Sequence, residues 1–335
     1  VLIDPDPETL SAYRKLEREF IDLKDHLAEN RDQPARTADN RPIELLGNVN
    51  SVSDAHAATA MGASGVGLYR TEYLFLSHPN VPDEEEQTEA YRQLIEASPQ
   101  RRITIRTLDL GGDKSVPFVG YRHEANPFMG WRSIRLSFEH PEFFGTQIRA
   151  ILRAAACSGA KKGKASAAAA DVKLLFPMIT TLDEMRRVRQ MVRRARHRLS
   201  EQGLPHADVP IGVMIEVPAA AIAIESLLEV VDFVSIGSND LVQYLMAADR
   251  DNPKVSHLCE PLSPAVIRTL ANVVRACNRM QKPVKLCGEM AGQLRAFPLL
   301  LGMGLRSFSM SPAFIPTFKE LATHISLPQS RRILE

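Results

Sequence analysis

Two neighbouring apolar segments near the middle of the chain constrain its fold more than any other feature. The first reads IGVMIEVP from Ile211 and reaches an acid at Glu216; the second reads VDFVSIGSND from Val231 and reaches Asp240. The intervening AAAIAIESLLEV is typical of a helix, so the three segments predict a β-α-β unit with parallel strands. Chemistry in such units gathers where the strands end. We therefore expect the two carboxylates, beside Asn239, to form a site for a hard cation such as Mg²⁺.

Similar short apolar runs recur along the chain with helical segments between them. The candidate strands are Ile43–Val49, Gly65–Tyr69, Ile103–Thr107, Lys173–Met178, Ile211–Glu216, Phe233–Ile236, Val284–Cys287 and Ser307–Ser309. Segments such as Asp183–Leu199 and Pro264–Met280 are long enough for crossover helices. The repeat predicts an α/β fold of the (β/α)8 TIM-barrel type. A doubly wound open sheet is the alternative, but it would concentrate polar residues at one switch point, whereas here they follow nearly every run.

These runs divide the chain into three parts. Residues 1–41 are expected to form an N-terminal helix and a linker, residues 42–326 the barrel, and residues 327–335 a C-terminal tail. The segment Cys157–Asp171 is rich in Ala, Gly and Lys, which favours a solvated loop insertion. Because the chain begins at Val1 rather than Met, we expect it to be a fragment of a longer protein.

Composition narrows the class of protein. Hydrophobic residues make up 44% of 335, which predicts a sizeable core, and the net charge of +1 gives no drive towards nucleic acid or a membrane. No apolar run is long enough to cross a bilayer. The four cysteines are irregularly spaced, which favours neither a disulfide framework nor a zinc site. A reducing, cytoplasmic location fits them best.

Charged side chains follow several of the expected strands, where a barrel would gather them at one mouth. They include the arginines at positions 70, 106, 132, 135 and 250, and Glu289 after Cys287. Guanidinium groups bind phosphate and carboxylate through paired hydrogen bonds, and Mg²⁺ commonly takes one or two carboxylates plus substrate oxygens. Together they indicate a compact phosphate ester that also carries a carboxylate.

Each residue also has an ordinary structural interpretation. A single Arg at a strand end is often a surface charge or an ion pair. Asn239 or Asp240 could cap the helix that follows, without excluding metal binding. Cys287 is more often a small buried hydrophobe than a catalyst. Glu216 is harder to assign to a structural role, because it follows a wholly apolar run where an unpartnered charge is costly.

The motifs at these positions resemble a known family. They are GLYRTE, RTLDLGGDK, NPFMGWRSIR, MIEVPAA, SIGSNDLVQY, DR and CGEMAG, in that order, spanning roughly residues 43–325. The combination is similar to the phosphoenolpyruvate-binding domain of phosphoenolpyruvate-protein phosphotransferases, the Enzyme I family of the bacterial phosphotransferase system. The segment GGDK favours this family over pyruvate phosphate dikinase, and GLRSFSMSP is similar to its nitrogen-related branch.

The resemblance implies a role for each matching residue. It implies phosphoenolpyruvate contacts at Arg70, Arg106, Arg250, Asn239 and Asp240, with added positive charge from Arg132 and Lys114. It also implies Mg²⁺ ligands at Glu216 and Asp240, and a proton donor to the enol carbon at Cys287, so that pyruvate forms.

The resemblance further implies partners outside this chain. None of its histidines lies in a motif similar to the family's phosphoacceptor, so the acceptor is expected on a separate N-terminal domain, followed by an HPr-like phosphocarrier. The barrel is expected to form a homodimer. Three alternatives stay open: the barrel of a phosphoenolpyruvate synthase or dikinase, a non-catalytic phosphoenolpyruvate-sensing dimerisation module, and a Mg²⁺-dependent lyase acting on 2-oxo acids.

Overall fold

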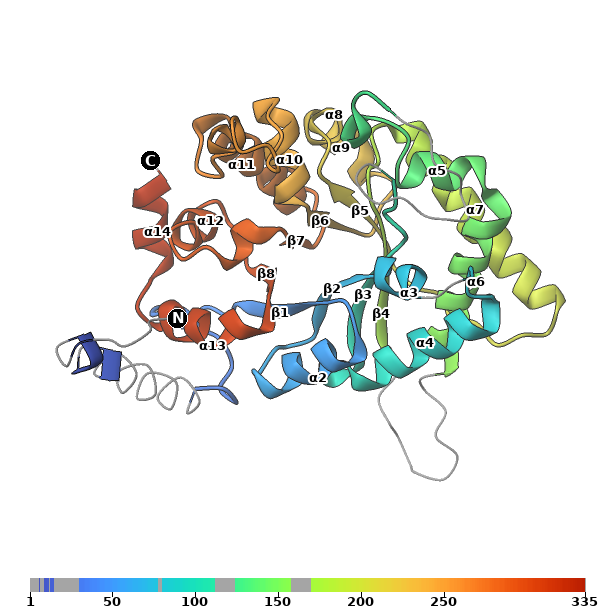
Figure 1. Ribbon diagram of the computed structural model, residues 1–335, viewed down its shortest axis with the longest axis horizontal. Helices are drawn as coiled ribbons and strands as arrows, with labels where there is room; N and C mark the ends of the chain where they lie inside the picture. The colour runs from blue at the N-terminus through green and yellow to red at the C-terminus, as the bar shows by residue number, and fades with distance from the viewer. Residues whose placement is uncertain are drawn as a thin grey trace.

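Eight parallel strands close into a barrel in chain order (Figure 1). The computed structural model describes residues 6, 9–11, 13–14, 30–77, 80–111, 124–157 and 170–334. The strands are β1 (Glu44–Val49), β2 (Val66–Arg70), β3 (Arg102–Arg106), β4 (Asp171–Phe176), β5 (Ile211–Ile215), β6 (Phe233–Ile236), β7 (Val284–Leu286) and β8 (Ser307–Met310). The pairing of β1 with β8 closes the ring, from Glu44 opposite Ser307 to Gly47 opposite Met310. The (β/α)8 barrel is therefore confirmed and the open sheet is excluded.

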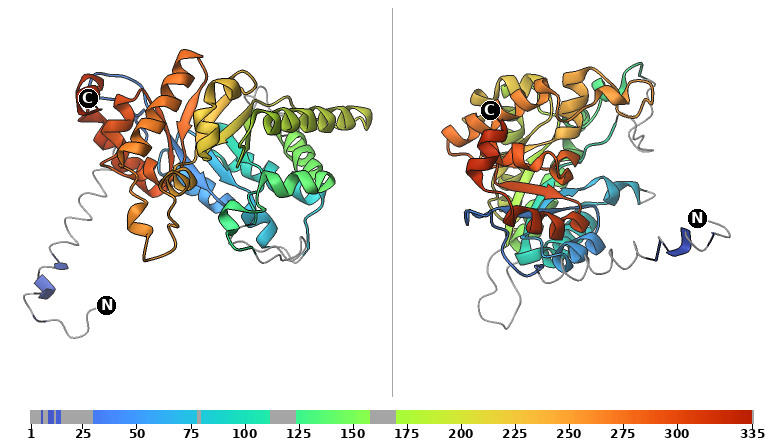
Figure 2. Two further views of the ribbon diagram at one scale, coloured as in Figure 1. Left: turned by 90° about the horizontal axis from the view of Figure 1, so that it is seen from above. Right: turned by 90° about the vertical axis from the view of Figure 1, so that its left-hand side faces the viewer.

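Helices surround the strands on the outside of the barrel (Figure 2). They are α2 (Val52–Ala60), α3 (Glu72–Leu76), α4 (Glu84–Ala97), α5 (Ile134–Glu139), α6 (Pro141–Cys157), α7 (Leu182–Glu201), α8 (Pro218–Ile222), α9 (Ile224–Leu228), α10 (Ser238–Met246), α11 (Pro264–Arg279), α12 (Phe297–Gly302), α13 (Ile315–Thr323) and α14 (Leu327–Leu334). The two crossover helices named from sequence correspond to α7 and α11. Helix α7 begins at a capping box in which Thr181 and Glu184 satisfy each other's backbone N–H groups. Within the described ranges, no helix is long and apolar enough to cross a membrane.

The segment AAAIAIESLLEV differs from the single helix expected. It forms two short helices, α8 and α9, separated at Ala223, whose ψ of 22° leaves the helical region. Ile222 is 84% exposed, whereas Ile224 and Leu227 of the next helix are buried. The buried residues of the two helices keep the spacing of a single helix face across the break: Ala220, Ala221, Ile224, Leu227 and Leu228.

The described residues form three buried hydrophobic clusters. A large cluster fills the space between the strands and the helices, a small one lies inside the barrel, and a third contains Phe75, Leu108 and Leu110. The inner cluster contains Leu68, Leu175, Met214, Phe233 and Cys287. Its contents show that the barrel is filled by side chains, as in other eight-stranded barrels, and is not a pore.

The linker before β1 lies against the segment that leads into α14 (Figure 1). In the linker, the Ala38 N–H donates to the Ile325 carbonyl at 3.0 Å, and Asp39 accepts from the Leu327 N–H at 3.1 Å. The segment expected as a C-terminal tail forms α14, which packs on α12. The expected N-terminal helix lies mostly outside the described residues, as does the interior of the Cys157–Asp171 loop.

Candidate active site at the carboxyl end of the barrel

One cavity of about 380 Å³ opens where the barrel strands end. Eight of the nine site residues named from sequence line it: Arg70, Arg106, Arg132, Glu216, Asn239, Asp240, Arg250 and Cys287. The ninth, Lys114, lies outside the described residues. The fold therefore brings together side chains from positions 70 to 287, as the strand-end argument predicts for a barrel.

Arg106 ends β3 and lies between two acids. Its side chain is 8% exposed and forms ion pairs with Glu72 and, at 3.1 Å, with Asp109. Burial by itself lowers the pKa of the guanidinium, but the two acids outweigh burial and the net pKa is raised. Arg106 is therefore a fixed cation whose orientation is set before any ligand arrives.

Arg132 forms a second buried cationic centre that shares an acid with the first. Its Nη2 donates to both carboxylate oxygens of Asp109 at 3.0 Å and to Asp240 Oδ2 at 3.1 Å, and its Nη1 donates to Tyr244 Oη at 3.3 Å. Asp109 thus holds the guanidinium groups of Arg106 and Arg132 together at the cavity wall.

Arg70 and Arg250 are less constrained. Burial, followed by repulsion from Arg106, lowers the pKa of Arg70, and Arg70 forms no ion pair with any residue in the described part of the chain. Arg250, with 37% of its side chain exposed, places Nη1 3.3 Å from Asp240 Oδ1. Arg70 is therefore available to an anion in the cavity without first breaking an ion pair, and Arg250 is held only through its partly exposed pair with Asp240.

Two buried carboxylates face this cluster. Glu216 is 2% exposed and accepts a hydrogen bond from the Met178 N–H at 2.6 Å. Burial, followed by repulsion from Asp240 and Asp109, raises the pKa of Glu216 to about 8. Asp240 Oδ1 accepts no hydrogen bond from the described residues. Crowded, incompletely satisfied carboxylates of this kind fit a site for a cation.

Asn239 and Asp240 lie in the first turn of α10, which begins at Ser238 after Gly237. The idea that either residue caps this helix is therefore wrong, since both lie inside it. Asn239 instead exchanges hydrogen bonds with Glu289: its Nδ2 donates to Oε1 at 3.0 Å and its Oδ1 accepts from the backbone N–H at 2.7 Å. This pair fixes the loop after Cys287 against the start of α10.

Cys287 follows β7 and points into the barrel. It is 2% exposed; Ser235 Oγ donates to its sulfur at 3.1 Å, and its thiol donates to the Ile236 carbonyl at 3.3 Å. Burial raises the pKa of the thiol, although Ser235 and Lys285 act in the opposite direction. A protonated thiol at the cavity floor can serve as a general acid.

Two acids of this cluster had no role assigned from sequence. Glu72 and Asp109 stand in the quoted motifs GLYRTE and RTLDLGGDK, but only the structure shows that they hold the arginines. The available signal was an acid directly beside an apolar strand, the same signal that identified Glu216.

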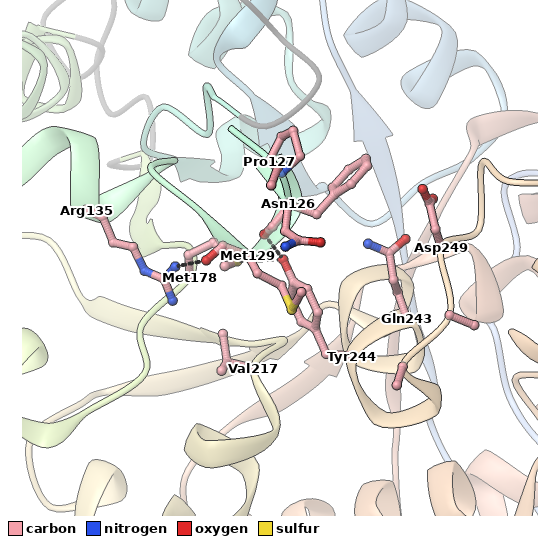
Figure 3. Close-up of a pocket in the computed structure, with 13 residues that line it drawn as sticks. Asn126, Pro127, Met129, Arg135, Met178, Val217, Gln243, Tyr244 and Asp249 are labelled. Carbon is pink, nitrogen blue, oxygen red and sulfur yellow. Dashed lines mark hydrogen bonds between the residues drawn. The ribbon is translucent and has the colours of Figure 1, made fainter. Parts of the chain in front are cut away.

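Arg135 lines a neighbouring pocket of about 550 Å³ (Figure 3). Its Nη1 donates to the Met129 carbonyl at 2.8 Å. Tyr244 also lines this pocket and donates through Oη to the Phe128 carbonyl at 2.5 Å. Arg135 therefore supports the loop beside the cavity and does not line the cavity itself.

Comparison with known proteins shows the family of the chain. The sequence profile of a family described as "PEP-utilising enzyme, PEP-binding domain" matches residues 24–327. The chain therefore belongs to the phosphoenolpyruvate-utilising enzymes, as their phosphoenolpyruvate-binding domain.

The similar curated proteins are more particular. The chain is 39% identical to a phosphoenolpyruvate-protein phosphotransferase of Staphylococcus carnosus, over 100% of this chain and 56% of that protein. It is also 39% identical to the Haemophilus influenzae phosphoenolpyruvate-protein phosphotransferase, over 99% of this chain and 56% of that protein. The chain thus spans 56% of the length of these relatives. A citrate lyase structure from Burkholderia xenovorans has a TM-score of 0.48 at 14% identity, over 85% of this chain and 79% of that one.

Proposed function

We propose that this domain is the phosphoryl-donor half of a phosphoenolpyruvate-protein phosphotransferase. It binds phosphoenolpyruvate with Mg²⁺, presents the phosphoryl group to a histidine on a separate domain, and protonates the remaining enolpyruvate to pyruvate. The observation that carries the proposal is the convergence of four arginines, two cation-site carboxylates and a thiol on one cavity.

The arginines supply the charge that phosphoryl transfer needs. Phosphoenolpyruvate carries a phosphate and a carboxylate, and guanidinium groups can bind both. Arg106 and Arg132 are held in place by Asp109, so they lose little freedom when substrate binds. Arg70 and Arg250 complete the anion site from the less constrained side. Fixed positive charge around the phosphoryl group favours its transfer, which depends mainly on positioning and electrostatics.

Glu216 and Asp240 would hold the Mg²⁺ ion. Among the described residues no group of three or more His, Cys, Asp or Glu side chains could hold a metal. That fits Mg²⁺, which commonly uses one or two carboxylates and takes its other ligands from substrate and water. When bound, the ion would neutralise charge on the substrate oxygens. It would also relieve the repulsion that raises the pKa of Glu216.

Cys287 acts on the product half of the reaction. After the phosphoryl group leaves, the enolate carbon needs a proton, and the protonated thiol at the cavity floor is in place to supply it. The electron pair of the enolate forms the new C–H bond, the S–H bond breaks, and its electron pair stays on sulfur as a thiolate.

The remaining parts of the pathway lie on other molecules or domains. The phosphoacceptor histidine would lie on a separate N-terminal domain, which passes the group to an HPr-like phosphocarrier in the cytoplasm, and the barrel would act as a homodimer. The length of the curated relatives supports a further domain, since this chain spans 56% of them. Their names favour a phosphotransferase over the dikinase and synthase alternatives.

The proton-donor step can be tested without the histidine domain. The thiolate that remains after the thiol protonates the enolate is also the base that removes a proton from pyruvate in the reverse direction. The chain should therefore exchange the methyl protons of pyruvate in deuterated water with Mg²⁺ present. Proton NMR should show exchange slowed about 100-fold or more in Cys287→Ala, with phosphoenolpyruvate binding retained. Cys277→Ala, which removes a buried thiol on α11, is the matched control and should exchange normally. Unchanged exchange in Cys287→Ala would contradict the proton-donor role.

A further inference from the structure

Lys285 is a buried cation inside the barrel with no role in the site described above. It is 7% exposed, and its Nζ donates to Thr104 Oγ1 at 2.5 Å and lies 5.5 Å from the centre of the Phe233 ring. No acid within the described ranges forms an ion pair with it. A lysine placed in a barrel interior without a counter-ion is costly, so its presence calls for a compensating role.

Other charged groups near Lys285 are already paired with one another. Glu44 forms an ion pair with Arg102, and Asp171 lies 3.1 Å from Arg102 and 3.6 Å from Lys173. Of these, Glu44 favours the protonated form of Lys285, while Arg102 and Lys173 oppose it. The neighbours at the amino end of the barrel therefore leave its charge largely uncompensated.

The strand geometry places Lys285 directly beneath Cys287. Both residues come from β7 and its continuation, two positions apart, and side chains at that spacing share one face of a strand. Lys285 lines a small cavity of about 80 Å³ at the amino end of the barrel, whereas Cys287 lines the substrate cavity at the carboxyl end. Two steps along a strand cover roughly 7 Å. At this spacing each group influences the pKa of the other.

Ser235 joins the two residues from the neighbouring strand. On β6 it stands opposite Lys285 in the strand register, and its hydroxyl donates to the sulfur of Cys287 at 3.1 Å. Ser235 thus contacts the sulfur directly, and Lys285 lies beside Ser235 on the adjacent strand. Neither residue lines the substrate cavity.

We propose that Lys285 is a positioning residue that, together with Ser235, stabilises the thiolate formed when Cys287 gives its proton to the enolate carbon. This inference rests on the proposed function, because it concerns the same proton transfer. A buried thiolate is unfavourable in an apolar surrounding, and an ammonium group and a hydroxyl are the groups that stabilise it.

The electrostatics of the two groups agree with this arrangement. Burial lowers the pKa of Lys285 to about 7, while a thiolate at Cys287 would raise it. Lys285 in turn lowers the pKa of the thiol against the effect of burial. Formation of the thiolate therefore favours the protonated lysine, which keeps the pair neutral overall.

The pKa of the Cys287 thiol tests this directly. The ultraviolet absorbance of the thiolate, taken as a difference from Cys287→Ala at each pH, gives the thiolate fraction in the wild type and in Lys285→Met. With a pKa of about 7, Lys285 is partly protonated near neutral pH. Loss of this charge roughly 7 Å away, in an effective dielectric of about 20, should lower the thiolate fraction near pH 7 by about tenfold. Lys319→Met, which removes another buried lysine on α13, should leave the thiol pKa unchanged.

Catalysis supplies the second measurement. Pyruvate proton exchange near pH 7 should slow in Lys285→Met by the same factor as the thiolate fraction falls, while phosphoenolpyruvate affinity stays within about twofold of the wild type. A thiolate fraction near pH 7 that does not change in Lys285→Met, or an exchange rate that does not follow it, would overturn the inference. Failure of the wild-type chain to bind phosphoenolpyruvate would instead contradict the proposed function, and the role of Lys285 with it.

Discussion

Asp109 offers a sharp test of how the site is held together. Its carboxylate is 4% exposed and contacts Arg132 Nη2 at 3.0 Å and Arg106 Nη1 at 3.1 Å. Asp109→Asn removes the negative charge and turns an amide towards two buried cations. Removing one partner of a buried ion pair costs about 3–5 kcal/mol. Because Glu72 still pairs with Arg106 and Asp240 with Arg132, we expect a loss near the lower end, about 3 kcal/mol.

Urea unfolding followed by circular dichroism measures this loss as a lower midpoint at an unchanged slope. The matched control is Asp183→Asn, which removes an exposed acid paired with Arg186 at 3.1 Å on α7. That pair is well solvated, so its loss should cost less than about 1 kcal/mol. If Asp109→Asn lost no more stability than the control, the reasoning that Asp109 organises the two arginines would be refuted.

Two further changes have directions that the structure sets. In Gly288→Ala, an added Cβ would lie 2.7 Å from the Ser238 backbone nitrogen and 2.8 Å from Asn239 Oδ1. Phosphoenolpyruvate affinity, measured by calorimetry, should therefore fall at least tenfold. Unchanged affinity would contradict the placement of Asn239. Burial lowers the pKa of Lys285 to about 7, from its ordinary value of 10.5. Between pH 7 and pH 10.5 the unfolded chain binds more protons than the folded chain, so the free energy of unfolding falls as the pH drops. Lys285→Met should remove this pH dependence of stability and raise the free energy of unfolding at pH 7 by on the order of 3 kcal/mol. A stability profile against pH identical to that of the wild type would count against a buried lysine.

Much of the fold follows from local sequence patterns. Each of the eight strands begins and ends within two residues of the run that predicted it, because a short apolar run followed by polar residues seldom forms anything but a strand in an α/β chain. The same pattern placed Glu216 and Asp240 at strand ends. Once the strands are parallel and the sheet is closed, these ends must converge on one mouth.

The contacts within the site could not be predicted in the same way. Asp109 meets Arg132 because Gly111 and Arg132 form an isolated antiparallel bridge outside the barrel strands, and because Ser133 adopts a φ of 56°. These are loop geometries with no periodic sequence signal. The break between α8 and α9 at Ala223 likewise has no periodic signal, because the apolar spacing of one helix continues across it.

Lys285 illustrates a third limit. In the sequence it is one polar residue in the short run VKL, where alternation permits it to face either side of the strand. Only the register with Ser235 and the hydrogen bond to Thr104 place it inside the barrel, beneath the thiol.

The most direct test of the central claim is a calorimetric titration of phosphoenolpyruvate into this chain, with and without Mg²⁺, for the wild type and for Glu216→Ala. The account predicts binding that Mg²⁺ strengthens in the wild type, and loss of that Mg²⁺ dependence in a Glu216→Ala protein that remains folded. Binding that is absent from the folded wild type, or that responds equally to Mg²⁺ in both proteins, would contradict it.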